Sequence, residues 1–225
     1  MEHKRRAIKS YTLRQGRLTA AQKQALEQLW PIYGVDFQAN RLDPGILFKR
    51  IAPLTLEIGF GNGDSLLQQA LSNPQHDYLG IEVHRPGVGR LLRLAAEAGI
   101  SNLRVINHDA VDVLQQQIPD NSLDCVQLFF PDPWHKKRHH KRRIINPEFI
   151  HLVRQKLKTG GRFHLATDWQ DYAEYMLEQM EQADGFSNTE GEGQFAHNTE
   201  RPPTKFEHRG RRLGHGVWDL VFSKN

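Results

Sequence analysis

The segment Leu54-Thr55-Leu56-Glu57-Ile58-Gly59-Phe60-Gly61-Asn62-Gly63 joins a short apolar run to a turn with three alternating glycines. Beyond it, apolar residues recur at the spacing of an amphipathic helix until Asn73-Pro74 stops the pattern. These apolar residues are Leu66, Leu67, Ala70 and Leu71. The segment therefore predicts a strand over 54–58, a tight loop and a helix.

The same rhythm of strand and helix continues toward the carboxyl end. Residues 123–130 are apolar almost throughout, as expected for a central strand with helices on both faces. Asn146 and Pro147 begin the next helix, and Gly160-Gly161 ends it. Further strands are expected over 78–83, 103–106, 162–166 and 217–222, and further helices are lined by 88–95, 111–118 and 172–180. This alternation predicts an α/β fold with a parallel, doubly wound sheet, which binds ligands beyond the carboxyl ends of its strands.

Length and charge narrow the class of protein. A chain of 225 residues is enough for one α/β domain with a full core. The net charge is only +4, but basic residues gather at 4–9, 135–143 and 201–212, which favours a polyanionic partner. The single cysteine, Cys125, lies in an apolar run and is interpreted as a core residue in a reducing compartment. No apolar stretch approaches the ~20 residues of a membrane span, so we expect a cytoplasmic protein.

The amino end has a different character from the rest. Residues 1–17 carry cations without apolar periodicity and are expected to form a flexible basic arm. Thr19 is expected to cap a helix that runs through Trp30 and is closed by Pro31. We therefore predict one domain over 18–225 that begins with this helix.

The glycine turn is a candidate ligand site. Gly59, Gly61 and Gly63 let the backbone turn tightly and approach a ligand closely, although a tight turn without a ligand is an alternative. A dinucleotide fingerprint requires glycine where the chain has Asp64, and a pyrophosphate is disfavoured beside Glu57. A carboxylate that leads into these glycines suits a cationic ligand, such as the amino and sulfonium groups of S-adenosylmethionine.

Two more acidic residues end neighbouring strands. Glu82 ends the second strand, where an acid commonly accepts hydrogen bonds from ribose hydroxyls. Asp109 follows the third strand, where its side chain either accepts from an adenine amino group or caps the next helix. Together with the glycine turn, they predict an adenosine-containing cofactor.

These features resemble the class I S-adenosylmethionine-dependent methyltransferases. More narrowly, Gly80-Ile81-Glu82-Val83, Phe130-Pro131-Asp132-Pro133-Trp134 with Lys136 and Arg138, Thr167-Asp168 and Thr204-Lys205-Phe206-Glu207 resemble the tRNA (guanine-N7)-methyltransferase family, and the likeness runs from about Arg14 to the carboxyl end. The resemblance implies a Rossmann-like, mostly parallel seven-stranded sheet with an antiparallel C-terminal strand. It also implies methyl transfer from S-adenosylmethionine to N7 of a guanosine in the variable loop of tRNA.

Asp132 is the expected catalytic residue. Guanine N7 has no proton to lose, so we expect this carboxylate to position the guanine and to stabilise its developing charge rather than to act as a base. The flanking prolines stiffen the loop, and Trp134 offers a stacking surface for a base. The alternative is a rigid turn with Trp134 as a core anchor. The resemblance also assigns the cofactor to Glu57, Gly59, Gly61, Gly63, Glu82, Asp109 and Asp132.

A basic run follows the motif directly. Nine consecutive basic or titratable residues, 135–143, either form a solvated loop or contact phosphates that relieve their mutual repulsion. The resemblance marks Lys136 as substrate-binding. We expect the RNA backbone to be held by Arg138, His139, His140, Lys141, Arg142 and Arg143.

The remaining substrate residues depend on the resemblance. Asp168 ends the fifth strand, and its local alternative is a helix cap. A polar loop over 196–212 contains Thr204, Lys205, Phe206 and Glu207, which the resemblance places in the guanine or RNA site. The histidines show no zinc-like spacing, so we expect no metal. We expect a monomer or a weak homodimer.

Two other functions are compatible with the sequence. A methyltransferase with the same cofactor could act on an exocyclic amine of nucleic acid or protein. A non-catalytic RNA-binding protein could be built on the same scaffold, but the unbroken set of Glu57, Gly59, Gly61, Glu82 and Asp132 disfavours it.

Overall fold

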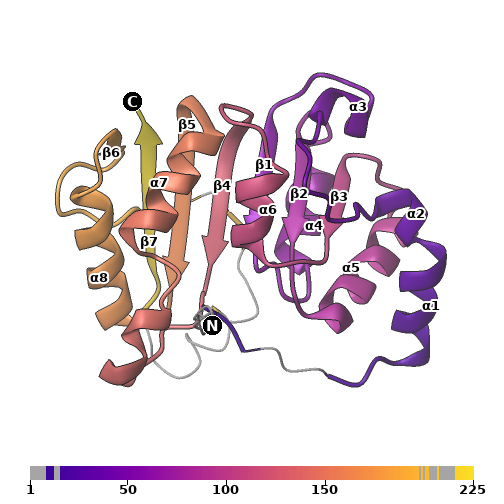
Figure 1. The fold of residues 1–225 in the computed structure, drawn as a ribbon, viewed down its shortest axis with the longest axis horizontal. Helices are drawn as coiled ribbons and strands as arrows, with labels where there is room; N and C mark the ends of the chain where they lie inside the picture. Colours follow the sequence, from indigo (N-terminus) through magenta and orange to yellow (C-terminus); the bar gives the residue numbers. More distant parts are fainter. Residues whose placement is uncertain (1–8, 13–15, 198, 200, 203–206, 208–215) are drawn as a thin grey trace, which may run out of the picture.

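The computed structural model describes residues 9–12, 16–197, 199, 201–202, 207 and 216–225, and a seven-stranded sheet is its frame (Figure 1). The strands lie in the order β3-β2-β1-β4-β5-β7-β6. Their bounds are β1 Leu54–Ile58, β2 Asp77–Ile81, β3 Leu103–Ile106, β4 Leu123–Phe129, β5 Leu157–Thr167, β6 Phe186–Asn188 and β7 Trp218–Lys224. The first five strands pair in parallel, and β7 runs antiparallel between β5 and β6. The predicted sheet is confirmed.

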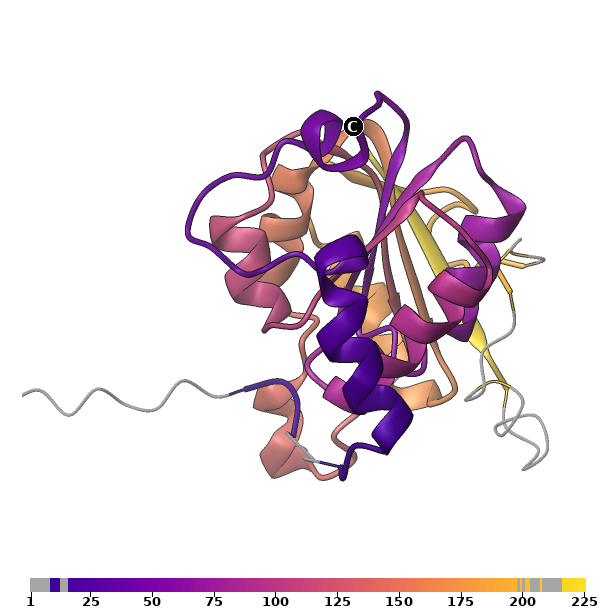
Figure 2. The same ribbon diagram turned by 90° about the vertical axis from the view of Figure 1, so that its right-hand side faces the viewer.

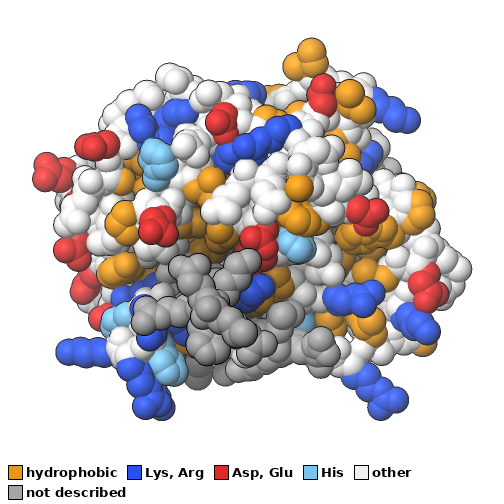
Figure 3. Space-filling view, in the orientation of Figure 1, with side chains coloured by type: hydrophobic (Ala, Val, Ile, Leu, Met, Phe, Trp, Pro, Cys, Tyr) orange, Lys and Arg blue, Asp and Glu red, His pale blue; other side chains and the backbone are white. Residues whose placement is uncertain are grey.

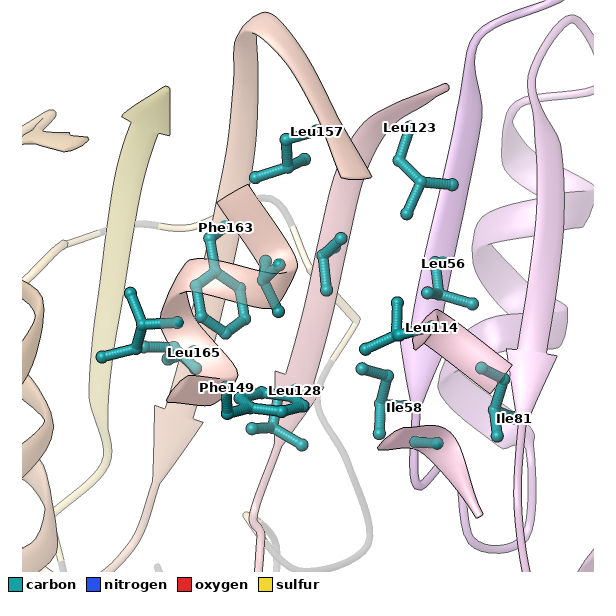
Figure 4. Close-up of a cluster of buried hydrophobic side chains, with 14 of the residues drawn as sticks. Leu56, Ile58, Ile81, Leu114, Leu123, Leu128, Phe149, Leu157, Phe163 and Leu165 are labelled. Carbon is teal, nitrogen blue, oxygen red and sulfur yellow. The ribbon is translucent and has the colours of Figure 1, made fainter. Parts of the chain in front are cut away.

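Helices cover both faces of the sheet, which Figure 2 shows nearly edge-on. Their bounds are α1 Ala20–Gln28, α2 Trp30–Tyr33, α3 Pro44–Phe48, α4 Asp64–Ser72, α5 Arg85–Glu97, α6 Ala110–Gln116, η1 Lys137–Arg142 (a 3-10 helix), α7 Pro147–Lys156 and α8 Gln170–Glu181. On one face Leu114 of α6 and Phe149 of α7 pack with Leu56, Leu128 and Phe163 of the central strands (Figure 4). On the other face, α1, α4 and α5 form a second buried cluster. Every residue of β1 is buried, including the polar Thr55 and the acidic Glu57, as expected for a central strand covered on both faces.

The amino-terminal helix differs from the expected one. Thr19 caps α1, because its side chain accepts from the Gln22 N–H while the Gln22 side chain accepts from the Thr19 N–H. The helix ends at Gln28, however, and Pro31 lies in the first turn of α2, where its missing N–H leaves no bond unmade. The prediction of one helix through Trp30 is therefore wrong.

The junction of α7 and β5 also differs from the prediction. The helix ends at Lys156 and the strand begins at Leu157, well before the two glycines. Leu157 pairs with Leu123 but Arg162 pairs with Cys125, so the intervening residues bulge out of the ladder. Gly160 adopts a φ of 76° inside this bulge, which is why glycine stands within a strand rather than at the end of a helix. Among the described residues, no helix is long and apolar enough to cross a membrane.

Candidate active site

A pocket of about 750 Å³ opens at the carboxyl ends of β1, β2 and β4. Its walls include Gly59 and Gly61 after β1, Glu82 after β2, Asp109 after β3 and Asp132 after β4. The parallel strands thus bring five of the predicted cofactor residues to one edge of the sheet, where a doubly wound fold binds its ligands. Lys136 and Trp134 line the same pocket.

The glycine turn is fastened to the end of β2 by a carboxylate. Glu82 Oε2 accepts a hydrogen bond from the Gly61 N–H at 2.8 Å, and Glu82 Oε1 accepts from the N–H groups of Val83 and His84 at 2.7 and 2.8 Å. Gly61 has a φ of 59°, and a Cβ built on it would meet no atom within 4 Å. The turn is therefore held firmly while the space above it stays open to a ligand.

Glu57 is a buried acidic residue near the end of β1. Only 3% of the residue is exposed, and its Oε2 has no hydrogen-bond partner among the described residues. Burial, with a smaller contribution from Glu82, raises the pKa of Glu57 to about 8, although Arg201 opposes the shift. A cationic group that reached this carboxyl would satisfy Oε2 and stabilise its ionised form. Gly63, the third glycine, instead packs near Leu91 of α5.

Asp109 caps a helix, which was the local alternative expected for it. Its side chain accepts from the Val111 N–H at 3.1 Å and caps α6. Its second oxygen lies 3.4 Å from Lys9 Nζ. The residue also lines the pocket, so capping does not remove it from the ligand site.

The loop that carries Asp132 is bounded by two unusual backbone conformations. Phe130 and Trp134 have φ of 53° and 49°, in the left-handed region that large side chains rarely adopt. The Phe130 N–H donates to Ala166 O at 2.8 Å, and Arg143 Nε donates to Pro133 O at 3.0 Å. These bonds hold a bent loop that presents Asp132 as an exposed residue at the pocket.

A short amino-terminal segment, residues 9–12, crosses this site, and we call it the strap. Trp134 Nε1 donates to Ser10 O at 2.9 Å, and Arg142 donates to Lys9 O and Tyr11 O at 3.1 and 3.2 Å. Ser10, Tyr11 and Thr12 line the pocket. These residues fall in the amino-terminal arm that was expected to be flexible, because cations without apolar periodicity carry no signal of regular structure.

The basic run divides into exposed and engaged members. Lys136, Lys137, Arg138 and Lys141 are exposed, and Lys, Arg and His side chains gather at the lower left of Figure 3, where η1 lies in Figure 1. Arg142 instead lies over the Trp134 ring, 3.8 Å from its centroid. His139 packs edge-on against the same ring, while His140 is half-buried.

Arg143 is the innermost member of that run. It is 4% exposed, pairs with Asp171, and lies over the rings of Tyr172 and Tyr175. A guanidinium in this position braces the loop through Pro133 O and does not face an external phosphate. We therefore leave Arg143 out of the proposed RNA contacts.

The predicted substrate residues beyond η1 are only partly described. Asp168 is half-buried directly after β5, and the N-cap position of α8 is held by Trp169, whose side chain makes no capping hydrogen bond, so Asp168 is not the cap of this helix. Thr204, Lys205 and Phe206 lie outside the described residues. Glu207 is 4% exposed and accepts a hydrogen bond from Arg201 at 2.6 Å.

Arg201 is the centre of a buried ionic network that sequence reasoning missed. Its guanidinium donates to both oxygens of Asp219 at 2.6 and 2.8 Å, and it lies over the rings of Phe129 and Phe130. His164 also contacts Asp219, at 2.7 Å. One signal was available, since Asp219 is a charged residue inside an apolar C-terminal strand. No group of metal-ligating side chains occurs among the described residues.

Comparisons with known proteins identify the fold of this chain and the family to which it belongs. The fold is that of a class I methyltransferase: an rRNA methylase from Streptococcus thermophilus superposes with a TM-score of 0.52 at 14% identity, over 77% of this chain and 87% of that one. A family model described as a putative methyltransferase matches residues 51–220. Proteins of Aeromonas hydrophila subsp. hydrophila and Hydrogenovibrio crunogenus, each named tRNA (guanine-N(7)-)-methyltransferase, are 58% and 57% identical. They align over 97% and 99% of this chain and 93% of each relative. The chain belongs to this tRNA (guanine-N(7)-)-methyltransferase family.

Proposed function

We propose that this protein transfers a methyl group from S-adenosylmethionine to N7 of a guanosine in the variable loop of tRNA, in the cytoplasm. The observation that carries the proposal is the placement of Asp132. One carboxylate stands exposed at the mouth of an acid- and glycine-lined pocket, directly before a helix of exposed cations. The high identity to relatives named for this reaction supports it.

The pocket fits the proposed cofactor. Glu57 does not itself line the pocket, but it lies two residues before Gly59, which does, and its buried Oε2, without a partner among the described residues, suits the α-ammonium group. The open space above Gly59 and Gly61 admits a chain against the backbone. A carboxylate offers about four lone-pair positions, and backbone N–H groups fill three of those of Glu82, which leaves one for a ribose hydroxyl. Asp109 provides an acceptor for the adenine amino group.

The chemistry requires alignment more than proton transfer. When bound, S-adenosylmethionine supplies a methyl group already activated by its sulfonium. Asp132 accepts hydrogen bonds from N1–H and N2–H of guanine, which orients N7 toward that methyl group and stabilises the positive charge that the ring gains. N7 carries a lone pair and no proton, so methyl transfer to it would need no base from the protein. The bent backbone at Phe130 and Trp134 fixes the carboxylate before substrate arrives.

The exposed cations of η1 provide the RNA contact. Arg138 and Lys141 are three residues apart on a 3-10 helix, so they share one side of it. With Lys136 and Lys137, they offer positive charge to phosphates beside the pocket. Such contacts position the RNA without reading its sequence.

The test is substitution of Asp132 with measurement of product and cofactor binding. We expect D132A to lower the rate of m7G formation about 100- to 1000-fold while S-adenosylmethionine binding, followed by calorimetry, stays within about threefold. D132N is the matched control for shape, and it should also fail because its amide donates where an acceptor is needed. Normal m7G in tRNA treated with D132A would refute the assignment. A product methylated on an exocyclic amine would refute the N7 acceptor while leaving the cofactor assignment intact.

A further inference from the structure

Trp169 is an exposed tryptophan beside the active site that has no part in the reaction described above. It is 37% exposed at the end of β5, directly after Asp168. A tryptophan ring suits a binding surface, because it offers a large apolar face together with one polar N–H group. Its backbone is fixed, because the Trp169 N–H donates to Thr167 Oγ1 at 3.2 Å and Trp169 O accepts from Tyr172 and Ala173 at the start of α8.

His135 connects this ring to the pocket. The His135 ring packs edge-on against Trp169, with the centroids 4.1 Å apart and the planes at 67°. His135 itself lines the pocket, whereas Trp169 does not. Trp169 therefore lies behind His135 as seen from the pocket, next to Asp168 and just after the end of β5.

The other tryptophan of the site is already occupied by the protein. Arg142 covers a face of Trp134 at 3.8 Å, His139 packs against its edge, and its indole N–H is bonded to Ser10 O. Its contacts make Trp134 an anchor for the strap. Trp134 lines the pocket but is half-buried, so the more exposed aromatic ring beside the pocket is that of Trp169.

We propose that Trp169, braced by His135, stacks on the base adjacent to the target guanosine; the proposal rests on the proposed function. A guanine that reaches Asp132 has to leave its stack, so its neighbour loses a stacking partner. An exposed indole next to the pocket replaces that partner. The setting favours a nucleotide over an apolar protein surface, because exposed Lys136 and Lys137 follow His135 in the chain and attract phosphate.

The first experiment compares W169L, which keeps apolar volume but removes the aromatic face, with W169F, which keeps an aromatic ring. We expect W169L to weaken tRNA binding about tenfold and W169F to stay within about threefold of the wild type. The salt dependence of binding should not change in either variant, because stacking releases no counterions. Leu71→Ala, at another exposed apolar residue, on α4, is the control and should bind as the wild type does.

The second experiment observes the stack directly. A tRNA carries 2-aminopurine next to the methylated guanosine, and its fluorescence is quenched when the base is stacked. With wild-type protein we expect the quenched state to persist on binding, and with W169L we expect the signal to rise. A bright signal with wild-type protein, or equal binding by W169L and wild type, overturns the proposal.

The two proposals fail in distinguishable ways. Wild-type protein that forms no m7G defeats the proposed function, whatever Trp169 does. Wild-type protein that forms m7G, together with a W169L variant of unchanged affinity and fluorescence, defeats only the role of Trp169. S-adenosylmethionine affinity should be unchanged in W169L, since Trp169 lies outside the pocket lining.

Discussion

The positive φ of Phe130 and Trp134 determines the shape of the loop that carries Asp132. A bulky residue with a positive φ costs on the order of 1–3 kcal/mol, so two of them within five positions require compensation. Compensation comes from the Ala166 carbonyl, from Arg143 and from the strap, each of which bonds one part of the loop. These bonds therefore hold the loop, and Asp132 with it, in one conformation.

At the residue scale we also expect Glu57, as a proposed cofactor ligand, to make cofactor binding depend on pH. Since burial raises its pKa to about 8, the carboxyl is protonated in the free protein at neutral pH. A bound ammonium favours the ionised form, so binding should release a proton, and affinity should rise about tenfold per pH unit toward pH 8 and then level off. Calorimetry in buffers of different ionisation enthalpy measures this proton directly.

The matched variant for that measurement is E57Q, which has the same shape without the titration. We expect it to bind S-adenosylmethionine more weakly and with no proton release. The raised pKa also makes folding less favourable as pH climbs from about 4.5 through about 8, and E57Q should flatten that decline. Proton release that persists in E57Q would show that another group titrates.

At the scale of elements, the three-residue period of the 3-10 helix η1 places its basic residues on different sides of the helix. His139 and Arg142, three residues apart, both pack on Trp134, while Arg138 and Lys141 share the exposed side. In sequence the run looks uniform. One side of the helix supports the loop and the strap, and the other faces solvent.

This division predicts different outcomes for two arginines. R138A should weaken tRNA binding and lower its salt slope by roughly one, without affecting the cofactor. R142A removes the hydrogen bonds that Arg142 donates to Lys9 O and Tyr11 O in the strap. Because the strap lines the pocket, R142A should weaken S-adenosylmethionine binding severalfold. Calorimetry with cofactor and salt titrations with tRNA separate the two effects. Equal cofactor affinity in both variants would mean that the strap does not support the pocket.

The same elements show what the sequence could and could not predict. Apolar periodicity and the glycine turn predicted six of the seven strands and five of the cofactor residues that meet at the pocket, because these patterns are local. The short elements β6 and α3 carry no such pattern and were not predicted, and the antiparallel C-terminal strand was expected from the family resemblance. The strap, the burial of Arg143 and the second helix at Pro31 depend on contacts between distant segments, which no local pattern encodes. The roles of the individual site residues stay predictions.

At the scale of the whole molecule, β7 lies between β5 and β6 and joins the end of the chain to the active-site loop. Asp219 of this strand bonds Arg201 and His164, and Arg201 in turn contacts Phe129 and Phe130. Burial would raise the pKa of Asp219, but the hydrogen bonds from His164 and Arg201 outweigh it and lower the pKa below its ordinary 3.8. The charge of Asp219 thus stabilises the fold at neutral pH.

Removing that charge should be costly. We expect D219A to destabilise the protein by about 3–5 kcal/mol, because Arg201 is left buried without its main partner. D219N keeps the volume, and its deficit relative to wild type should be full at neutral pH and shrink as pH falls below about 3.8. Urea unfolding at several pH values measures both. A deficit independent of pH would assign the loss to packing rather than charge.

The strap has a consequence for the order of events in a catalytic cycle. Its anchors, Trp134 and Arg142, belong to the segment proposed to contact RNA, while Lys9 reaches Asp109 at the proposed cofactor pocket. Since Ser10, Tyr11 and Thr12 line the pocket, we expect bound RNA to hold this segment against the cofactor. We therefore expect RNA to be released before the cofactor is exchanged, so that each encounter with a tRNA delivers one methyl group.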